Sequence, residues 1–217
     1  MRSVFEHSAA AFAVATSGLL VSPASVAQGV VDPTYGRISG DVCLAAGAGA
    51  TIASQGARPE GELRVRYLDA VGAFATYEDA VLSSASSDPR RVLSGGFELR
   101  PLFLYRWLRG LETRHGYFDL TIDSVGLELG AFLSAPPKSP TDFRPGFQLG
   151  LGLEVPVQAK ATGLWVGLHG GIRWADQPLP VALVGGPDAR EAYLTITLAW
   201  HQVVRTHIVD FSDSRPE

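Results

Sequence analysis

The residues best suited to acid–base chemistry lie near the end of the chain, where His201, His207 and Asp210 follow one another closely. Histidine and carboxylate groups can act as general acid and base, and a lipid-modifying enzyme would also need a nucleophile beside them. Ordinary polarity at the end of a strand explains the same residues, and we favour that interpretation. The chain has no G-x-S-x-G or H-E-x-x-H pattern, and the Gly-Ala-Gly run at 47–49 is followed by Ile52 instead of a third phosphate-binding glycine. The sequence therefore favours a protein without enzymatic activity and names no catalytic residue beyond these weak candidates.

A second set of charged residues recurs at alternate positions of segments that resemble strands. These residues are Asp41, Arg64, Arg66, Glu98, Arg100, Glu128, Glu154, His169, Arg173 and His201. Alternation places them on one face of a sheet, and charges of both signs on an enclosed face are expected to pair, because an unpaired buried charge is costly. We expect a polar network that fills the interior of a closed sheet, with Glu154 paired to His169 or Arg173.

A third group mixes charged and aromatic residues in the segment 107–123. Its members are Trp107, Arg109, Glu112, Arg114, His115 and Tyr117. This mixture is found at recognition surfaces, but it is also typical of the aromatic belt and solvated charges at a membrane interface. We favour the belt, to which Trp174 and Trp200 would also belong, whereas Trp165 falls on the enclosed face and is expected to fill space there.

Composition limits the possible partners and cofactors. The chain has 217 residues, a net charge of −4, 24 glycines and 46% hydrophobic residues, which suits one domain of packed strands and turns. No basic stretch is present to hold a phosphate backbone, so we expect no nucleic-acid partner. Cys43 is the only cysteine, which excludes an intramolecular disulfide and a multi-cysteine metal site. We expect neither a metal nor a cofactor.

The start of the chain has the pattern of a secretory signal peptide. Arg2 precedes an apolar run at 9–21, and Ser-Val-Ala at 25–27 offers small residues for a signal peptidase, so we expect cleavage after Ala27. A membrane-anchoring helix is the alternative, but the run is shorter than the ~20 residues that a spanning helix needs. We therefore expect a signal peptide at 1–27, a barrel domain at 28–211 and a polar tail at 212–217.

Alternating apolar residues and turn chemistry predict the elements that would position these side chains. The expected strands cover 38–52, 62–77, 91–100, a segment from 124 onwards, 147–157, 164–174 and 193–203. The first two are joined by a turn at 55–61, and a bulge near Asp69 would absorb a disturbance of phase in the second. The segment 101–110 could prolong the preceding strand, but Pro101 and Gly110 frame it as a short helix, which we favour, with a loop from 111 to 123 after it. An eighth strand would fall at 206–211 or 179–185.

The clearest strand, 147–157, places Phe147, Leu149 and Leu151 on one face and Gln, Gly and Glu on the other. With the export signal, this pattern resembles the small bacterial outer-membrane β-barrel proteins, although no specific family is indicated. The resemblance implies an all-β, antiparallel, up-and-down transmembrane barrel of about eight strands, with apolar residues facing lipid and polar residues enclosed. It also implies the outer membrane of a Gram-negative-type bacterium as location, lipid and the barrel-insertion machinery as partners, and a monomer.

Function stays open at this level. A structural role, or a narrow passage for small solutes, fits the barrel, and a secreted soluble β-barrel binding protein and an outer-membrane lipid-modifying enzyme remain as alternatives. Two features depart from the resemblance. The last expected strand is followed by the polar tail instead of a terminal aromatic residue, and a periplasmic N-terminus places the long connections near 78–90, 135–145 and 175–190 on the periplasmic side, where short turns are expected.

Overall fold

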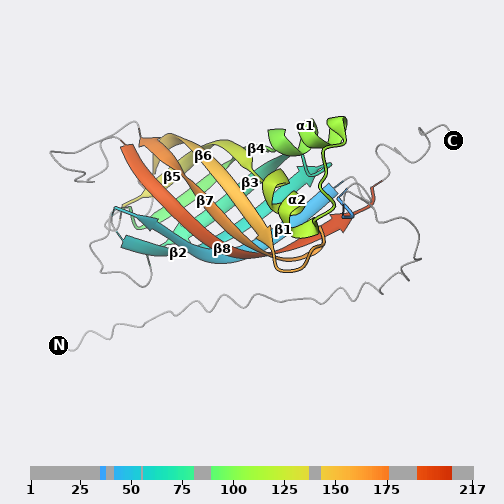
Figure 1. Cartoon of the computed structure of the whole chain (residues 1–217). Coiled ribbons are helices and arrows are strands. Elements are labelled where there is room, and N and C mark those ends of the chain that lie inside the picture. Colours follow the sequence, from blue (N-terminus) through green and yellow to red (C-terminus); the bar gives the residue numbers. More distant parts are fainter. Residues whose placement is uncertain are drawn as a thin grey trace, which may run out of the picture. The chain divides into compact units, whose positions relative to one another are not determined.

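A computed structural model describes residues 35–37, 42–54, 56–80, 89–136, 143–175 and 190–206. Within these residues, eight antiparallel strands pair in chain order and close into a barrel, because β8 pairs with β1 (Figure 1). The strands are β1 Val42–Ala53, β2 Gly56–Tyr67, β3 Val71–Asp79, β4 Arg91–Leu99, β5 Gly126–Ala135, β6 Arg144–Pro156, β7 Gly163–Ala175 and β8 Arg190–Val204. The expected all-β, antiparallel, up-and-down barrel of about eight strands is confirmed.

The eighth strand lies inside the segment 62–77, where the sequence predicted one strand. Here β2 ends at Tyr67 and β3 begins at Val71, and the N–H of Ala70 donates to the Tyr67 carbonyl at 3.0 Å. Leu68 and Asp69 have φ values of 50° and 52°, in the left-handed region used by tight hairpin turns. The expected bulge near Asp69 is therefore wrong, and the disturbance of phase there is a complete turn.

The connection predicted at 55–61 is also largely strand. β1 ends at Ala53 and β2 begins at Gly56, whose φ of 107° favours glycine at this tight connection. Of the two segments considered for an eighth strand, 179–185 lies outside the described residues. In the other, Thr206 is described but belongs to no strand, and 207–211 lies outside the described residues.

The division of 62–77 into two strands changes the side on which the long connections lie. We call the end where β1 begins and β8 ends the terminal end, marked by the paired Val42 and Val204, and the opposite end the loop end. The connections 80–90, 136–143 and 176–189 all join strands at the loop end. The sequence placed these connections on the side where β1 begins. That expectation is wrong, because 62–77 was counted as one strand instead of two, and the additional strand moves every later connection to the opposite end.

Two short helices connect β4 to β5 at the terminal end (Figure 1). α1 spans Pro101–Arg109, and the N–H of Gly110, in left-handed conformation at φ 61°, donates to the carbonyls of Arg106 and Trp107. This confirms the expected helix. The predicted loop at 111–123 is wrong in part, because it contains α2, Gly116–Asp123. Neither helix is long and apolar enough to span a membrane.

Apolar side chains lie mainly on the outer face of the barrel wall and polar side chains mainly on its inner face, which is the reverse of the arrangement usual in a soluble protein. On β6, Phe147, Leu149 and Leu151 are exposed, with Phe147 at 66%, whereas Gln148 and Glu154 are buried at 2% each. The same alternation runs through the other strands. The described barrel is therefore largely apolar on its outside and rich in charge on its inside.

Candidate functional site

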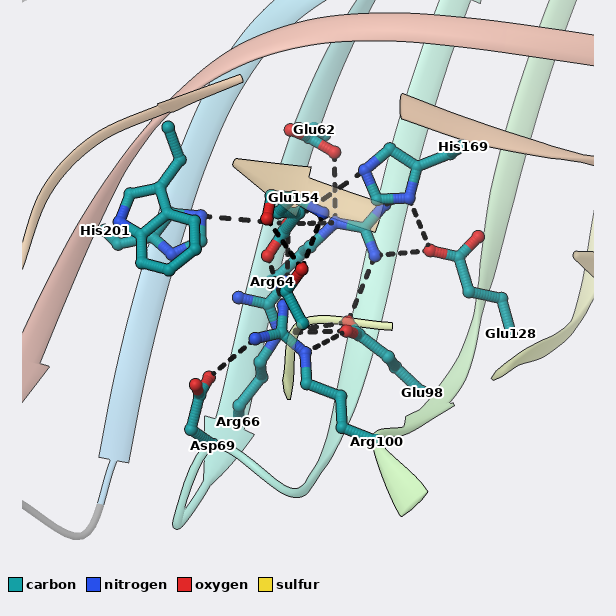
Figure 2. Close-up of polar contacts among 12 residues, drawn as sticks. Glu62, Arg64, Arg66, Asp69, Glu98, Arg100, Glu128, Glu154, His169 and His201 are labelled. Carbon is teal, nitrogen blue, oxygen red and sulfur yellow. Dashed lines mark hydrogen bonds and ion pairs between the residues drawn. The ribbon is translucent and has the colours of Figure 1, made fainter. Parts of the chain in front are cut away.

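An ion-pair network centred on Arg64 fills the middle of the barrel (Figure 2). Arg64 projects inward from β2 because it shares the polar phase of that strand. Its Nε donates to Glu62 at 3.0 Å, and its Nη1 donates to Glu98 at 3.1 Å and to Glu128 at 2.6 Å. One guanidinium thus joins carboxylates from β2, β4 and β5, so it ties together strands that are distant in sequence.

Two further arginines extend this network toward the terminal end. Arg66 donates to Glu98 at 3.0 Å and to Glu154 at 2.7 Å. Arg100, just before α1, donates to Glu98 at 2.8 Å, to Asp69 at 3.0 Å and to Glu154. Glu98 and Glu154 therefore each bridge neighbouring guanidinium groups, whose positive charges would otherwise repel one another. We call these residues, with the histidines below, the central network: Glu62, Arg64, Arg66, Asp69, Glu98, Arg100, Glu128, Glu154, His169 and His201.

The two histidines lie at the edge of the central network. His169 Nδ1 is 2.8 Å from Glu128 Oε1, and His201 Nε2 is 3.7 Å from Glu154 Oε1. The His201 ring stacks on Trp165, with centroids 4.7 Å apart and planes 10° from parallel. The Trp165 indole donates to the Ala161 carbonyl at 3.1 Å. His201 is thus held between an aromatic ring and a carboxylate that already binds arginine, and it is 2% exposed.

A second ion-pair cluster occupies the loop-end half of the interior. Arg58 Nε donates to Glu78 at 2.8 Å, and Arg173 Nη2 donates to the same carboxylate. Arg173 also donates to Gln148 at 3.2 Å and lies 4.3 Å from the centroid of the Tyr193 ring. We call this set, with Glu191 at 3.7 Å from Arg58, the loop-end cluster. It is less fully hydrogen-bonded than the central network.

Several polar atoms of the loop-end cluster have no protein hydrogen-bond partner among the described residues. They are Nη1 and Nη2 of Arg58, Nη1 of Arg173, Oε1 of Glu191 and the Tyr193 hydroxyl, all buried. Buried polar groups are normally satisfied, and a polar cavity that has room supplies the missing partners as water. These are therefore atoms of the interior to which bound water would supply the missing hydrogen bonds.

Ion pairs also fasten α2 at the terminal end. The Tyr35 hydroxyl donates to Asp119 at 2.9 Å, and Arg37 pairs with Asp123 at 2.6 Å. Arg106 of α1 donates to Asp119 and, at 2.9 Å, to Asp123. Burial and the adjacent Asp119 carboxylate raise the pKa of Tyr35 to about 12. Although burial opposes it, hydrogen bonds from the Thr113 N–H, Arg106 and Tyr35 hold the pKa of Asp119 below its ordinary value.

The structure brings most of the charged residues selected from the sequence into the interior. Nine of the ten are described, and Asp41 lies outside the described residues. Eight of these nine belong to the central network, whereas Arg173 belongs to the loop-end cluster. The expected pairing of Glu154 with Arg173 is replaced: Glu154 contacts Arg66 and Arg100, and Arg173 contacts Glu78. His169 stays within 4.0 Å of Glu154.

The weak catalytic candidates are not assembled within the described part of the chain. His201 points into the central network, while His207 and Asp210 lie outside the described residues. Within the described residues, no group of three or more histidine, cysteine, aspartate or glutamate side chains could hold a metal ion.

The residues proposed for loop recognition all lie on or between the two helices. Arg109, Arg114, His115 and Tyr117 are exposed, and Trp107 and Glu112 are half-buried. Trp107 stacks with Phe103 at 6.3 Å between centroids, and the Tyr117 hydroxyl donates to the Val157 carbonyl at 3.3 Å. These residues share a region at the terminal end but do not converge on a common polar centre.

Several interior residues were not selected from the sequence as members of the polar network. They are Thr51, Arg58, Glu60, Glu62, Asp69, Glu78 and Glu191, whereas Gln148 was placed on the enclosed face without being selected. Arg58 and Glu60 were assigned to a turn, although they continue the alternation of Glu62 and Arg64 on β2. Glu191 continues the alternation of Tyr193 and Thr195 on β8. Extending each alternation to its full length would have found these residues.

The fold and the site define an eight-stranded up-and-down barrel with a charged interior and an apolar exterior. Searches for relatives add no further identification: no protein-family model, no curated protein and no solved structure matches this chain.

Proposed function

We propose that this protein is an integral outer-membrane β-barrel whose lumen is closed by ion pairs and whose role is structural. One observation carries the proposal: every strand contributes exposed large apolar side chains to the outside of the barrel, while most of its arginines and glutamates are enclosed. Examples from four strands are Leu63, Phe97, Phe147 and Trp200, exposed by 54% to 72%. Hydrocarbon is the solvent in which such an exterior is stable.

The alternative of a secreted soluble barrel carries a large energetic cost. Apolar surface left in water costs about 25 cal/mol per Å², and this exterior presents it continuously instead of in scattered residues. Within a bilayer the opposite sorting would be unfavourable, since an arginine that faces lipid at mid-depth costs about 2–4 kcal/mol. The sorting of side chains therefore favours a bilayer around the barrel.

The connections support a particular orientation. Outer-membrane barrels have short periplasmic turns and longer extracellular loops. Besides the short connection 54–55, the loop end carries the longer connections 80–90, 136–143 and 176–189. The terminal end carries the tight turns at 68–70 and 157–162 and one long connection, 100–125, which is folded into α1 and α2. We infer that the loop end faces outward and the terminal end faces the periplasm, where α1 and α2 lie. The signal peptide expected at 1–27 is consistent with this route, and those residues lie outside the described part of the chain.

A structural role follows from the filled interior. An eight-stranded barrel has a lumen just wide enough for side chains, and here the central network joins side chains from β2, β4, β5, β6 and β7 across it. A solute could pass the central network only if several hydrogen bonds between Arg64 and its carboxylate partners were broken. We therefore expect the resting barrel to be closed to ions and solutes.

Cell fractionation combined with a heat-modifiability gel tests this proposal. The full chain, expressed with its own N-terminal segment in a Gram-negative host, should sediment with outer membranes, resist extraction by alkaline carbonate, and migrate differently in detergent gels before and after boiling. A soluble periplasmic protein whose mobility does not depend on heating would overturn the proposal.

The unsatisfied atoms of the loop-end cluster favour a second candidate function, a narrow passage for small polar solutes. Arg58, Arg173 and Tyr193 contribute buried polar atoms without a protein partner to the loop-end half of the barrel, but the central network lies beyond it. Solute flux into liposomes distinguishes the two roles. A structural barrel gives no flux above that of empty liposomes, whereas flux through the wild-type protein that increases in Arg64→Ala would establish a passage gated by the central network.

A further inference from the structure

α1 exposes three large apolar side chains, although it buries Phe103 against the protein. Leu102, Tyr105 and Leu108 are exposed, and Leu108 is 75% exposed. Arg106, by contrast, faces inward and pairs with Asp119 and Asp123 of α2. On a soluble domain, the solvent face of a helix normally carries polar and charged residues, whereas this face carries two leucines and a tyrosine beside Arg109. The exposed apolar residues of α1 therefore favour a nonaqueous neighbour.

Exposed apolar residues also occur in the chain before and after α1. Leu111, after the helix, is 49% exposed, and Tyr117 and Phe118 of α2 are also exposed. On the other side α1 follows β4 after one residue, and β4 ends at the exposed Leu99. Leu127, which pairs with Leu99 across β4 and β5, is exposed as well. Exposed apolar residues are thus found at the end of β4, at the start of β5, on α1 and on α2.

The charged and aromatic residues of this region have the distribution found at a membrane interface. The Arg109 guanidinium lies 6.0 Å from the centroid of the Tyr105 ring, which leaves its charge at the edge of the apolar face. Arg114 is exposed in the following loop. Arginine reaches from apolar surroundings toward headgroups, and tyrosine is enriched at that depth. The nine residues of α1 are too few to cross a bilayer, so the helix can only lie along it.

We propose that α1 lies in the headgroup region of the bilayer that surrounds the barrel, with Leu102, Tyr105 and Leu108 inserted among the upper acyl chains. Arg109 and Arg114 would then lie at the level of the lipid phosphates. The partner is the phospholipid surface at the terminal end, and this inference rests on the proposed membrane location of the barrel. The ion pairs of Arg106 and the connection to β4 fix the helix at the edge of the barrel, so it inserts without having to fold on the membrane.

Fluorescence quenching by lipid tests this inference. In a Cys43→Ala background, single cysteines replace Leu108, Leu149 or Lys160 and carry the fluorophore NBD, and the folded protein is placed in phosphatidylcholine–phosphatidylglycerol vesicles with nitroxide lipids. Leu149 lies on the outer face of β6 and tests the barrel itself, and Lys160 is an exposed polar residue in the 157–162 turn. A heat-dependent mobility shift establishes that each variant has folded.

We expect quenching at position 108 to exceed quenching at position 160 at least twofold, and to be stronger with nitroxides near the headgroup than near the chain end. Tyr105→Cys provides a second labelled position if Leu108→Cys does not fold. Strong quenching at 149 with weak quenching at both 105 and 108 would overturn the interfacial helix while leaving the barrel in the membrane, and it would favour a protein partner for this face. Absence of quenching at 149 would overturn the proposed function itself.

Discussion

Replacement of Arg64 by methionine should destabilise the barrel far more than the loss of an arginine at its surface. Methionine keeps much of the length of the side chain but removes the charge and all its hydrogen bonds. Glu62 has Arg64 as its ion-pair partner, and Glu128 would keep only the contact with His169, 2.8 Å away. Glu98 would still contact Arg66 and Arg100. The substitution thus leaves two buried carboxylates poorly compensated.

The expected magnitude follows from this count of partners. Breaking a buried ion pair by removing one member costs about 3–5 kcal/mol, because the remaining charge stays buried and unpaired. The loss is large beside a total stability of about 5–15 kcal/mol. Arg91 provides the matched control, since it pairs with Asp79 at a similar distance, 3.0 Å, but its side chain is 45% exposed. Exposed pairs contribute about 0–1 kcal/mol, so Arg91→Met should be nearly neutral.

Urea unfolding of the protein in phospholipid vesicles at pH 7, followed by tryptophan fluorescence, measures both substitutions. A double-mutant cycle with Glu128→Gln separates the pair from its surroundings. Because Arg64 Nη1 lies 2.6 Å from Glu128, the combined loss should be clearly smaller than the sum of the single losses. An Arg64→Met protein within 1 kcal/mol of the wild type, or no more affected than Arg91→Met, would refute the reasoning that the central network stabilises the barrel.

Two further predictions concern packing of the lumen and the helix pair. A Cβ added to Gly47 would lie 2.7 Å from Ala199 Cβ and 2.9 Å from its Cα, so Gly47→Ala should lower the free energy of unfolding by about 1–3 kcal/mol. A Cβ added to Gly61 meets open space, so Gly61→Ala should be nearly neutral. Equal effects of the two substitutions in urea melts would contradict this packing. The lowered pKa of Asp119 implies a stabilising contribution that is present above its ordinary pKa and is lost as pH falls through the lowered value. Hydrogen exchange of residues 101–125 should therefore accelerate only in acid for the wild type and already at neutral pH for Asp119→Asn, and identical pH profiles would contradict that role.

The sequence predicted most of the wall because one face of each strand is uniformly apolar. On β6, Leu149 and Leu151 alternate with Gly150 and Gly152. This period-two pattern arises because alternate side chains point to the enclosed side, so it predicts both the strand and the face that each residue occupies. The turn between β2 and β3 was missed for a physical reason. Arg66 and Gly72 both face inward, so the alternation keeps its parity across residues 68–70 and looks like one strand with a local disturbance.

The second helix and the exact ion pairs could not be predicted in the same way. α2 contains Gly, Tyr, Phe, Thr and Ile, which are modest helix formers, and its conformation depends on contacts of Asp119 and Asp123 with arginines distant in sequence. Pairing within the lumen likewise depends on register. The two charges Glu154 and Arg173 share the interior, but their positions along the barrel axis assign them to different clusters.

Accessibility of a spin label along the outer face of β6 tests the central claim most directly. Single cysteines at positions 147, 149, 151 and 155, in the Cys43→Ala background, would be labelled and the protein returned to vesicles, with Lys160→Cys as the aqueous reference. If the apolar exterior faces lipid, labels at 149 and 151 will collide readily with oxygen and rarely with a water-soluble nickel complex, and the label at 160 will show the reverse. Collision with nickel at 149 and 151 as frequent as at 160 would show that water surrounds the barrel and would contradict the account.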